Sequence, residues 1–106
     1  MTVLEIEDRG GSTFVVRGQL DLDTVPAFRE AVLPSVTSGS DIELDFSELT
    51  FLDSSGLQAL VSIATEVAPG CVTVRGVRRG PLSVLSLTGL LDIRGLRVIP
   101  AEEDEP

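Results

Sequence analysis

The stretch Leu52-Asp53-Ser54-Ser55-Gly56-Leu57 decides how this chain folds and where its chemistry lies. An apolar run ends at the Asp-Ser-Ser-Gly turn, and apolar residues at helical spacing follow it. Because Asp and Ser are favoured helix N-caps, the turn predicts a strand that ends here and a helix that begins here. Two adjacent hydroxyls at a helix N-terminus, beside a glycine that leaves room around them, also make a favourable place for a phosphate group.

The length and composition of the chain indicate one domain. A chain of 106 residues buries roughly 65% of the surface that its unfolded form exposes, which is enough for a core without disulfides or metals. No run reaches about 18 apolar residues, and no signal-peptide pattern opens the chain. We therefore expect a soluble, cytoplasmic protein with no membrane partner.

The charge of the chain argues against nucleic acid and anionic membranes as partners. Its formal net charge is −9, and its four aromatic residues are all Phe, which leaves little for a base-stacking surface. All eight basic residues are Arg. Arg75, Arg78 and Arg79 cluster in one short segment, which we interpret as a solvated loop.

Hydrophobic periodicity predicts the order strand, strand, helix, strand, helix, strand, helix, strand. The expected strands lie at 3–7, 13–20, 42–46, 72–74 and 96–98, with Gly10-Gly11 as the first turn. The first expected helix begins at Val25, has apolar spacing that reaches Val36, and is ended by Pro34 and residues 37–40. The other two run from Leu57 to Ala68 and from Pro81 to Gly89. Strands that alternate with helices after an N-terminal hairpin predict an α/β fold with a mixed, largely parallel sheet packed by α-helices.

The residue inventory excludes the common catalytic centres. The chain contains no His and no Lys, so it cannot build a Ser-His-Asp triad, a Ser-Lys dyad, a P-loop or a Schiff base. Cys71 is the single cysteine, and without His no metal-site spacing exists, so neither a metal nor a cofactor is expected. Asp21, Asp23 and Asp53 would lie together if the sheet joins their strand ends. We interpret them as solvated cap carboxylates and expect no enzyme activity.

The Asp-Ser-Ser-Gly turn has two interpretations that the residues alone leave open. In the first, Asp53 or Ser54 is simply the N-cap of the helix and contributes on the order of 1 kcal/mol. In the second, Ser55 is exposed in the first helical turn and accepts a phosphate from another protein. The helix N-terminus would tolerate the added charge of about −1.5 to −2, so the fold need not melt.

Three motifs resemble the STAS domain family, in particular its bacterial anti-sigma factor antagonists. The motifs are Gly18-Gln19-Leu20-Asp21, then Leu44-Asp45-Phe46-Ser47 with Phe51–Leu57, and Leu87-Thr88-Gly89-Leu90. The resemblance runs from about Val3 to Val98. It predicts a single STAS domain over residues 1–99, followed by an acidic tail over residues 100–106 that we expect to be disordered.

The resemblance implies a role in transcription regulation by partner switching, as in stress responses. In this family the unmodified antagonist binds an anti-sigma factor that is also a serine kinase, and a sigma factor is released. The kinase then phosphorylates the serine before the glycine, here Ser55, and a PP2C-type serine phosphatase restores the unmodified form. The implied partner and switch surface consists of Asp21, Thr24, Asp53, Ser54, Gly56 and Leu57, with Leu57 giving apolar contact. The alternative is an unswitched STAS module that scaffolds a larger complex, such as a stressosome-like or lipid-transport assembly.

Overall fold

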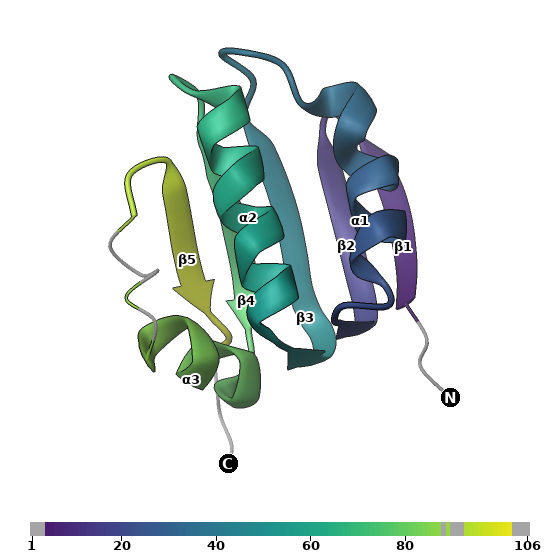
Figure 1. Ribbon diagram of the computed structural model, residues 1–106, viewed down its shortest axis with the longest axis vertical. Coiled ribbons are helices and arrows are strands. Elements are labelled where there is room, and N and C mark those ends of the chain that lie inside the picture. The colour runs from purple at the N-terminus through teal and green to yellow at the C-terminus, as the bar shows by residue number, and fades with distance from the viewer. Residues whose placement is uncertain (1–3, 88, 90–92, 103–106) are drawn as a thin grey trace.

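The computed structural model describes residues 4–87, 89 and 93–102, and it confirms the predicted α/β class (Figure 1). The elements, in chain order, are β1 (Leu4–Gly10), β2 (Thr13–Leu20), α1 (Val25–Val32), the 3-10 turn η1 (Leu33–Ser35), β3 (Ile42–Leu52), α2 (Ser54–Val67), β4 (Val72–Val77), α3 (Arg79–Leu87) and β5 (Leu96–Pro100). The order of strands and helices is the one that periodicity predicts.

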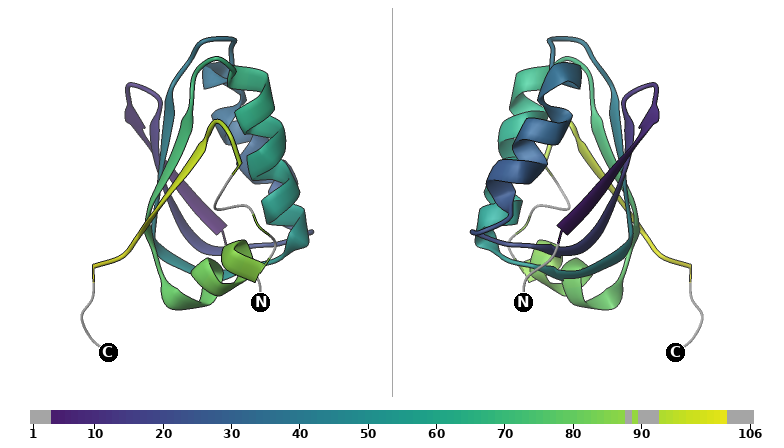
Figure 2. Two further views of the ribbon diagram at one scale, coloured as in Figure 1. Left: turned by 90° about the vertical axis from the view of Figure 1, so that its left-hand side faces the viewer. Right: turned by 90° about the vertical axis from the view of Figure 1, so that its right-hand side faces the viewer.

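The five strands form one sheet in the order β1-β2-β3-β4-β5. β1 and β2 make the expected antiparallel hairpin, and every other neighbouring pair is parallel. Helices α1 and α2 lie side by side on one face of the sheet, and α3 lies at the end where β3 and β4 finish (Figures 1 and 2). The opposite face carries charged side chains joined in ion pairs, including Arg17 with Glu7 and Arg75 with Glu43.

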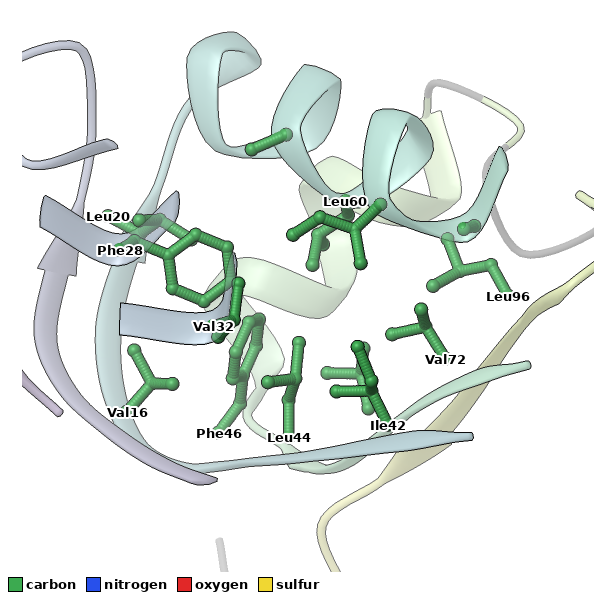
Figure 3. Close-up of a cluster of buried hydrophobic side chains, with 14 of the residues drawn as sticks. Val16, Leu20, Phe28, Val32, Ile42, Leu44, Phe46, Leu60, Val72 and Leu96 are labelled. Carbon is green, nitrogen blue, oxygen red and sulfur yellow. The ribbon is translucent and has the colours of Figure 1, made fainter. Parts of the chain in front are cut away.

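The hydrophobic core fills the space between the sheet and the helices α1 and α2 (Figure 3). Leu44 and Phe46 of β3 are fully buried and share this core with Phe28 of α1 and Leu60 of α2. Each such side chain contributes about 1.5–3 kcal/mol on full burial. Leu85 of α3 belongs to the same core, so α3 closes one end of it.

Several element boundaries differ from the prediction. α1 ends at Val32 and gives way to η1, because Pro34 has no N–H and its ring clashes with a continuing α-helix. β3 continues six residues beyond Phe46, and two register shifts against β2 bend it on the way. α3 begins at Arg79, before Pro81, which suits proline's tolerance of the first helical turn.

The chain is ordered past the predicted domain boundary. Pro100 is the last residue of β5, and the N–H of Ala101 donates to the carbonyl of Val77 at 2.9 Å. Most of the predicted acidic tail, residues 103–106, lies outside the described residues, as do Val3 and part of the Leu87–Leu90 motif. Among the described residues, no helix has both the length and the apolar character that crossing a membrane requires.

Candidate functional site

The two turns that the sequence singles out lie next to each other because β2 and β3 end together. Leu20, the last residue of β2, pairs with Leu52, the last residue of β3. One residue further on, the N–H of Asp53 donates to the carbonyl of Leu20 at 3.3 Å. The turn after β2 and the Asp-Ser-Ser-Gly turn are therefore neighbours at the lower edge of the sheet in Figure 1.

Asp53 is the N-cap of α2. Its backbone is extended, with φ −118° and ψ −173°, and its carboxylate accepts hydrogen bonds from the N–H groups of Ser55 at 2.9 Å and Gly56 at 3.3 Å. The carbonyl of Asp53 accepts the first helical hydrogen bond, from the N–H of Leu57. Of the two candidates for the cap, Asp53 takes the position, and both serines fall inside the first turn of the helix.

The two serine side chains are available at this helix start. Ser54 is exposed and Ser55 is half-buried. Within the part of the chain that the structure describes, neither hydroxyl makes a hydrogen bond, whereas the backbone N–H of Ser55 is held by Asp53. Esterification of either hydroxyl would therefore break no side-chain hydrogen bond, and the helix N-terminus favours negative charge there.

Gly56 serves close packing and does not open space around the serines. A Cβ atom at this position would lie 2.5 Å from Cδ1 of Leu52 and 3.0 Å from Cγ of Leu20. Both leucines are buried at the ends of their strands. The glycine thus lets the first turn of α2 press directly onto the ends of β2 and β3, which fixes where the serines lie.

Asp21 and Thr24 hold the turn between β2 and α1. The Asp21 carboxylate accepts from the N–H groups of Asp23 at 3.0 Å and Thr24 at 3.1 Å. The hydroxyl of Thr24 accepts from the N–H of Asp21 and lies 2.9 Å from the carbonyl of Gln19, to which it donates. Asp21 and Thr24 are both half-buried. These bonds make the turn rigid, in the manner of an Asx-turn.

The remaining predicted site residues divide between surface and core. Asp23 is exposed, and its carboxylate accepts no hydrogen bond within the described residues. Leu57, expected to contact a partner, is only 5% exposed and packs in the core. Because Leu57 packs in the core, little of its side chain is available for the partner contact that the resemblance implies.

Two exposed apolar residues at this edge are not found by sequence reasoning. Leu22 is 72% exposed in the turn after β2, and Phe51 is 47% exposed near the end of β3. One feature of the sequence could have indicated that Leu22 is exposed: it is an apolar residue within the polar cap segment Asp21-Leu22-Asp23-Thr24. Phe51 carries no signal, because strand alternation alone does not reveal a bulge.

The two turns of the candidate site carry charge of one sign, whereas Arg78 and Arg79 lie at the start of α3, at the same end of the sheet (Figure 1). The segments 18–28 and 47–65 contain four carboxylates and no Arg. Asp21, Asp23 and Asp53 form no ion pair among the described residues, whereas Glu48 is paired with Arg17. No group of three or more potential metal ligands occurs in the described part of the chain. The two turns and the strand ends before them therefore present three carboxylates without an ion pair, two exposed apolar side chains and two hydroxyls without a hydrogen bond among the described residues.

Comparison with known proteins identifies the family. Residues 6–98 match the family model described as "Mlab, STAS domain". The anti-sigma-B factor antagonist of Bacillus subtilis is 25% identical over 80 residues, which cover 74% of this chain and 73% of that protein. The crystal structure of an anti-sigma factor antagonist from Mycobacterium paratuberculosis superposes with a TM-score of 0.71 at 27% identity, covering 92% of this chain and 86% of the other.

A third comparison supports the fold. The anti-sigma factor antagonist SpoIIAA in its unphosphorylated form superposes with a TM-score of 0.68 at 22% identity, over 91% of this chain and 87% of the other. The family match covers nearly the whole ordered domain, including both turns of the candidate site. The chain belongs to the STAS domain family, and the relatives it resembles are anti-sigma factor antagonists.

Proposed function

We propose that this protein is an anti-sigma factor antagonist switched by phosphorylation of Ser55. In its unmodified form it binds an anti-sigma factor that is also a serine kinase, and a sigma factor is released in the cytoplasm. One observation carries the proposal. The Ser55 hydroxyl makes no hydrogen bond within the described residues, and Ser55 is a half-buried residue in a helical turn that Asp53 fixes through the Ser55 N–H.

The protein acts in this scheme as a substrate and binding partner, not as an enzyme. Phosphorylation of a serine needs ATP, a divalent metal and a base that accepts the hydroxyl proton. A chain without His or Lys lacks the usual bases and phosphate-binding groups, so the kinase supplies all three. The family resemblance supports this division of labour, as does the position of Ser55 at a helix N-terminus, where the product phosphate is tolerated.

The switch is a local block at the binding surface. A 100-fold loss of affinity corresponds to roughly 2.7 kcal/mol of binding free energy. A phosphate of charge about −1.5 to −2 on Ser55 would sit beside the carboxylate of Asp53 and, as the family resemblance implies, near that of Asp21, in an interface closed to water. Repulsion, added bulk and unpaired burial of the dianion together supply a change of that size. Because Asp53 still caps α2, no change of fold is required.

The test uses the purified protein with ATP, a divalent metal and kinase-type anti-sigma factors from the same organism. Mass spectrometry should find the phosphate on Ser55, and the Ser54→Ala variant should still be modified. Ser55→Ala should bind the kinase and resist modification. Ser55→Asp should bind weakly with an unchanged circular dichroism spectrum. A PP2C-type phosphatase should restore binding of the phosphorylated protein. Unmodified Ser55 with every such kinase would overturn the proposal, and an unfolded Ser55→Asp variant would overturn the local block.

A second candidate function is the one that the family resemblance leaves open, and the matching family model describes the STAS domain without naming a phosphorylation switch. In this alternative the domain is an unswitched scaffold within a larger complex. The scaffold would form its complex equally well with Ser55→Ala and Ser55→Asp, because no phosphate regulates it. The same pair of variants therefore separates the two functions.

A further inference from the structure

Large apolar side chains are exposed at two turns of the candidate site. Among the described residues, four large hydrophobic side chains are exposed, namely Leu22, Leu33, Phe51 and Ile99. Two of the four, Leu22 and Phe51, flank the Leu20–Leu52 pair that joins the two turns of the candidate site. Leu33 lies at the far end of α1, and Ile99 lies on the edge strand β5.

Hydrogen bonds fix the backbone of the turn that carries Leu22. It occupies the turn in which the carbonyl of Asp21 accepts from the N–H groups of Thr24 at 3.1 Å and Val25 at 2.9 Å. The Asp21 carboxylate accepts further hydrogen bonds in the same turn, from the N–H groups of Asp23 and Thr24. An apolar side chain on a backbone fixed in this way loses little conformational entropy when a partner covers it, which favours tight binding.

The backbone at Phe51 is also fixed, by its pairing with β2. Its backbone pairs with Gln19, and the neighbouring Thr50 hydroxyl donates to the carbonyl of Gly18 at 3.0 Å. The register shift between Gly18 and Gln19 places one extra residue of β3 at this point, so Leu49 and Leu52 point inward while Phe51 remains 47% exposed. Aromatic residues, including Phe, are enriched at the buried centres of protein interfaces.

We infer that Leu22 and Phe51 are the apolar anchors by which this protein docks on its anti-sigma factor, in an apolar recess rimmed by Arg or Lys. The inference rests on the proposed function, and it names the residues and the partner chemistry of that binding surface. The expected Arg or Lys on the partner follows from charge complementarity. Asp21 and Asp23 flank Leu22 in the chain, Asp53 follows Phe51 by two residues, and none of the three has an ion-pair partner within the described residues. Docking through these anchors brings the kinase to Ser55 in the adjacent turn.

The experiment compares two anchor variants with two matched exposed-residue variants. Leu22→Ser and Phe51→Thr remove the anchors, and Leu33→Ser and Ile99→Thr remove apolar side chains of similar exposure elsewhere. Affinity for the kinase-type anti-sigma factor is measured by calorimetry, with thermal unfolding as the check on folding. Each anchor variant should bind about tenfold or more weakly, and each control should stay within about twofold of the wild type. Raising the salt concentration should weaken binding of the wild type.

The outcomes separate this inference from the function on which it rests. If the wild type binds and Ser55 is phosphorylated, but both anchor variants bind like the controls, the anchors are wrong and the switch stands. If the wild type neither binds nor is modified, the proposed function fails and the inference fails with it. An anchor variant that unfolds is replaced by Leu22→Ala or Phe51→Val, for which the same affinity loss is required.

Discussion

Gly56 and Leu52 are packed so closely that a methyl group on the glycine would lie 2.5 Å from Cδ1 of Leu52. This contact sets the distance between the start of α2 and the end of β3. Leu20 closes the same space from β2, since its Cγ would lie 3.0 Å from that methyl group. The position of the candidate phosphorylation site thus depends on the packing of two core leucines and not only on the polar turn.

We expect Gly56→Ala to destabilise the protein by about 1–3 kcal/mol, because the new methyl group overpacks a buried site. Urea unfolding measures the effect. Gly80→Ala is the matched control, since Gly80 lies in α3 with nothing within 4 Å of its Cβ position. The control should be neutral or stabilising by up to about 1 kcal/mol. Leu52→Val should recover part of the loss in the Gly56→Ala background, and equal losses for both glycines would contradict the packing argument.

Asp53→Ala should lower the free energy of unfolding by about 1 kcal/mol, because two N–H groups at the start of α2 lose their acceptor. Asp23→Ala is its control, since that exposed carboxylate accepts no hydrogen bond within the described residues. Denaturant unfolding of both variants checks the difference. A cap that acts only through its negative charge would make the two substitutions equivalent.

Thr24→Val should cost about 1 kcal/mol, because its hydroxyl links the N–H of Asp21 to the carbonyl of Gln19 in a half-buried turn. Thr24→Ser keeps the hydroxyl and should retain most of the stability. Hydrogen exchange of the Asp21 amide gives a local readout, and it should accelerate in Thr24→Val alone. Unchanged exchange in that variant would mean that the turn is held by the Asp21 carboxylate without the threonine.

The order of the elements follows from the sequence because each element carries a strong periodic pattern and ends at Pro, Gly or a cap residue. The neighbouring positions of Asp21 and Asp53, each one residue beyond the paired Leu20 and Leu52, follow too, since neighbouring parallel strands end at one edge of the sheet. Pro34, expected to end the first helix, does so, since α1 gives way to η1 beside it, and Val36 lies beyond the helix although its apolar spacing fits the helical pattern.

Which side chains are exposed at the site is harder to predict from the sequence. Leu57 belongs to the apolar stripe of α2, so its side chain is buried in the core although it is part of the Asp-Ser-Ser-Gly-Leu motif. Strict alternation would put Leu49 and Phe51 on one face of β3, but the extra residue at the bulge separates them. Exposure at Leu22 and Phe51 therefore depends on a turn and a register shift, which only the three-dimensional structure reveals.

Low pH should reduce the free energy of unfolding, partly because it protonates Glu7 on the face of the sheet opposite α1 and α2. The hydrogen bond from Arg17 lowers the pKa of Glu7 most, followed by the hydrogen bond from Arg9. The folded protein therefore holds this proton less tightly than the unfolded chain. The resulting stability is complete above the unfolded pKa and is lost as the pH falls through the folded pKa.

Arg17→Gln should raise the pKa of Glu7 toward its ordinary value and flatten the acid side of the stability profile. Carboxyl-carbon NMR titration measures the pKa, and urea unfolding across the acid range measures the profile. The effect on stability should be small and should shrink further in high salt, because the pair is exposed to solvent. Arg97→Gln, an exposed arginine with no ion pair among the described residues, should leave the Glu7 titration unchanged. If both variants shift Glu7 equally, the cause is net charge and not the hydrogen bond from Arg17.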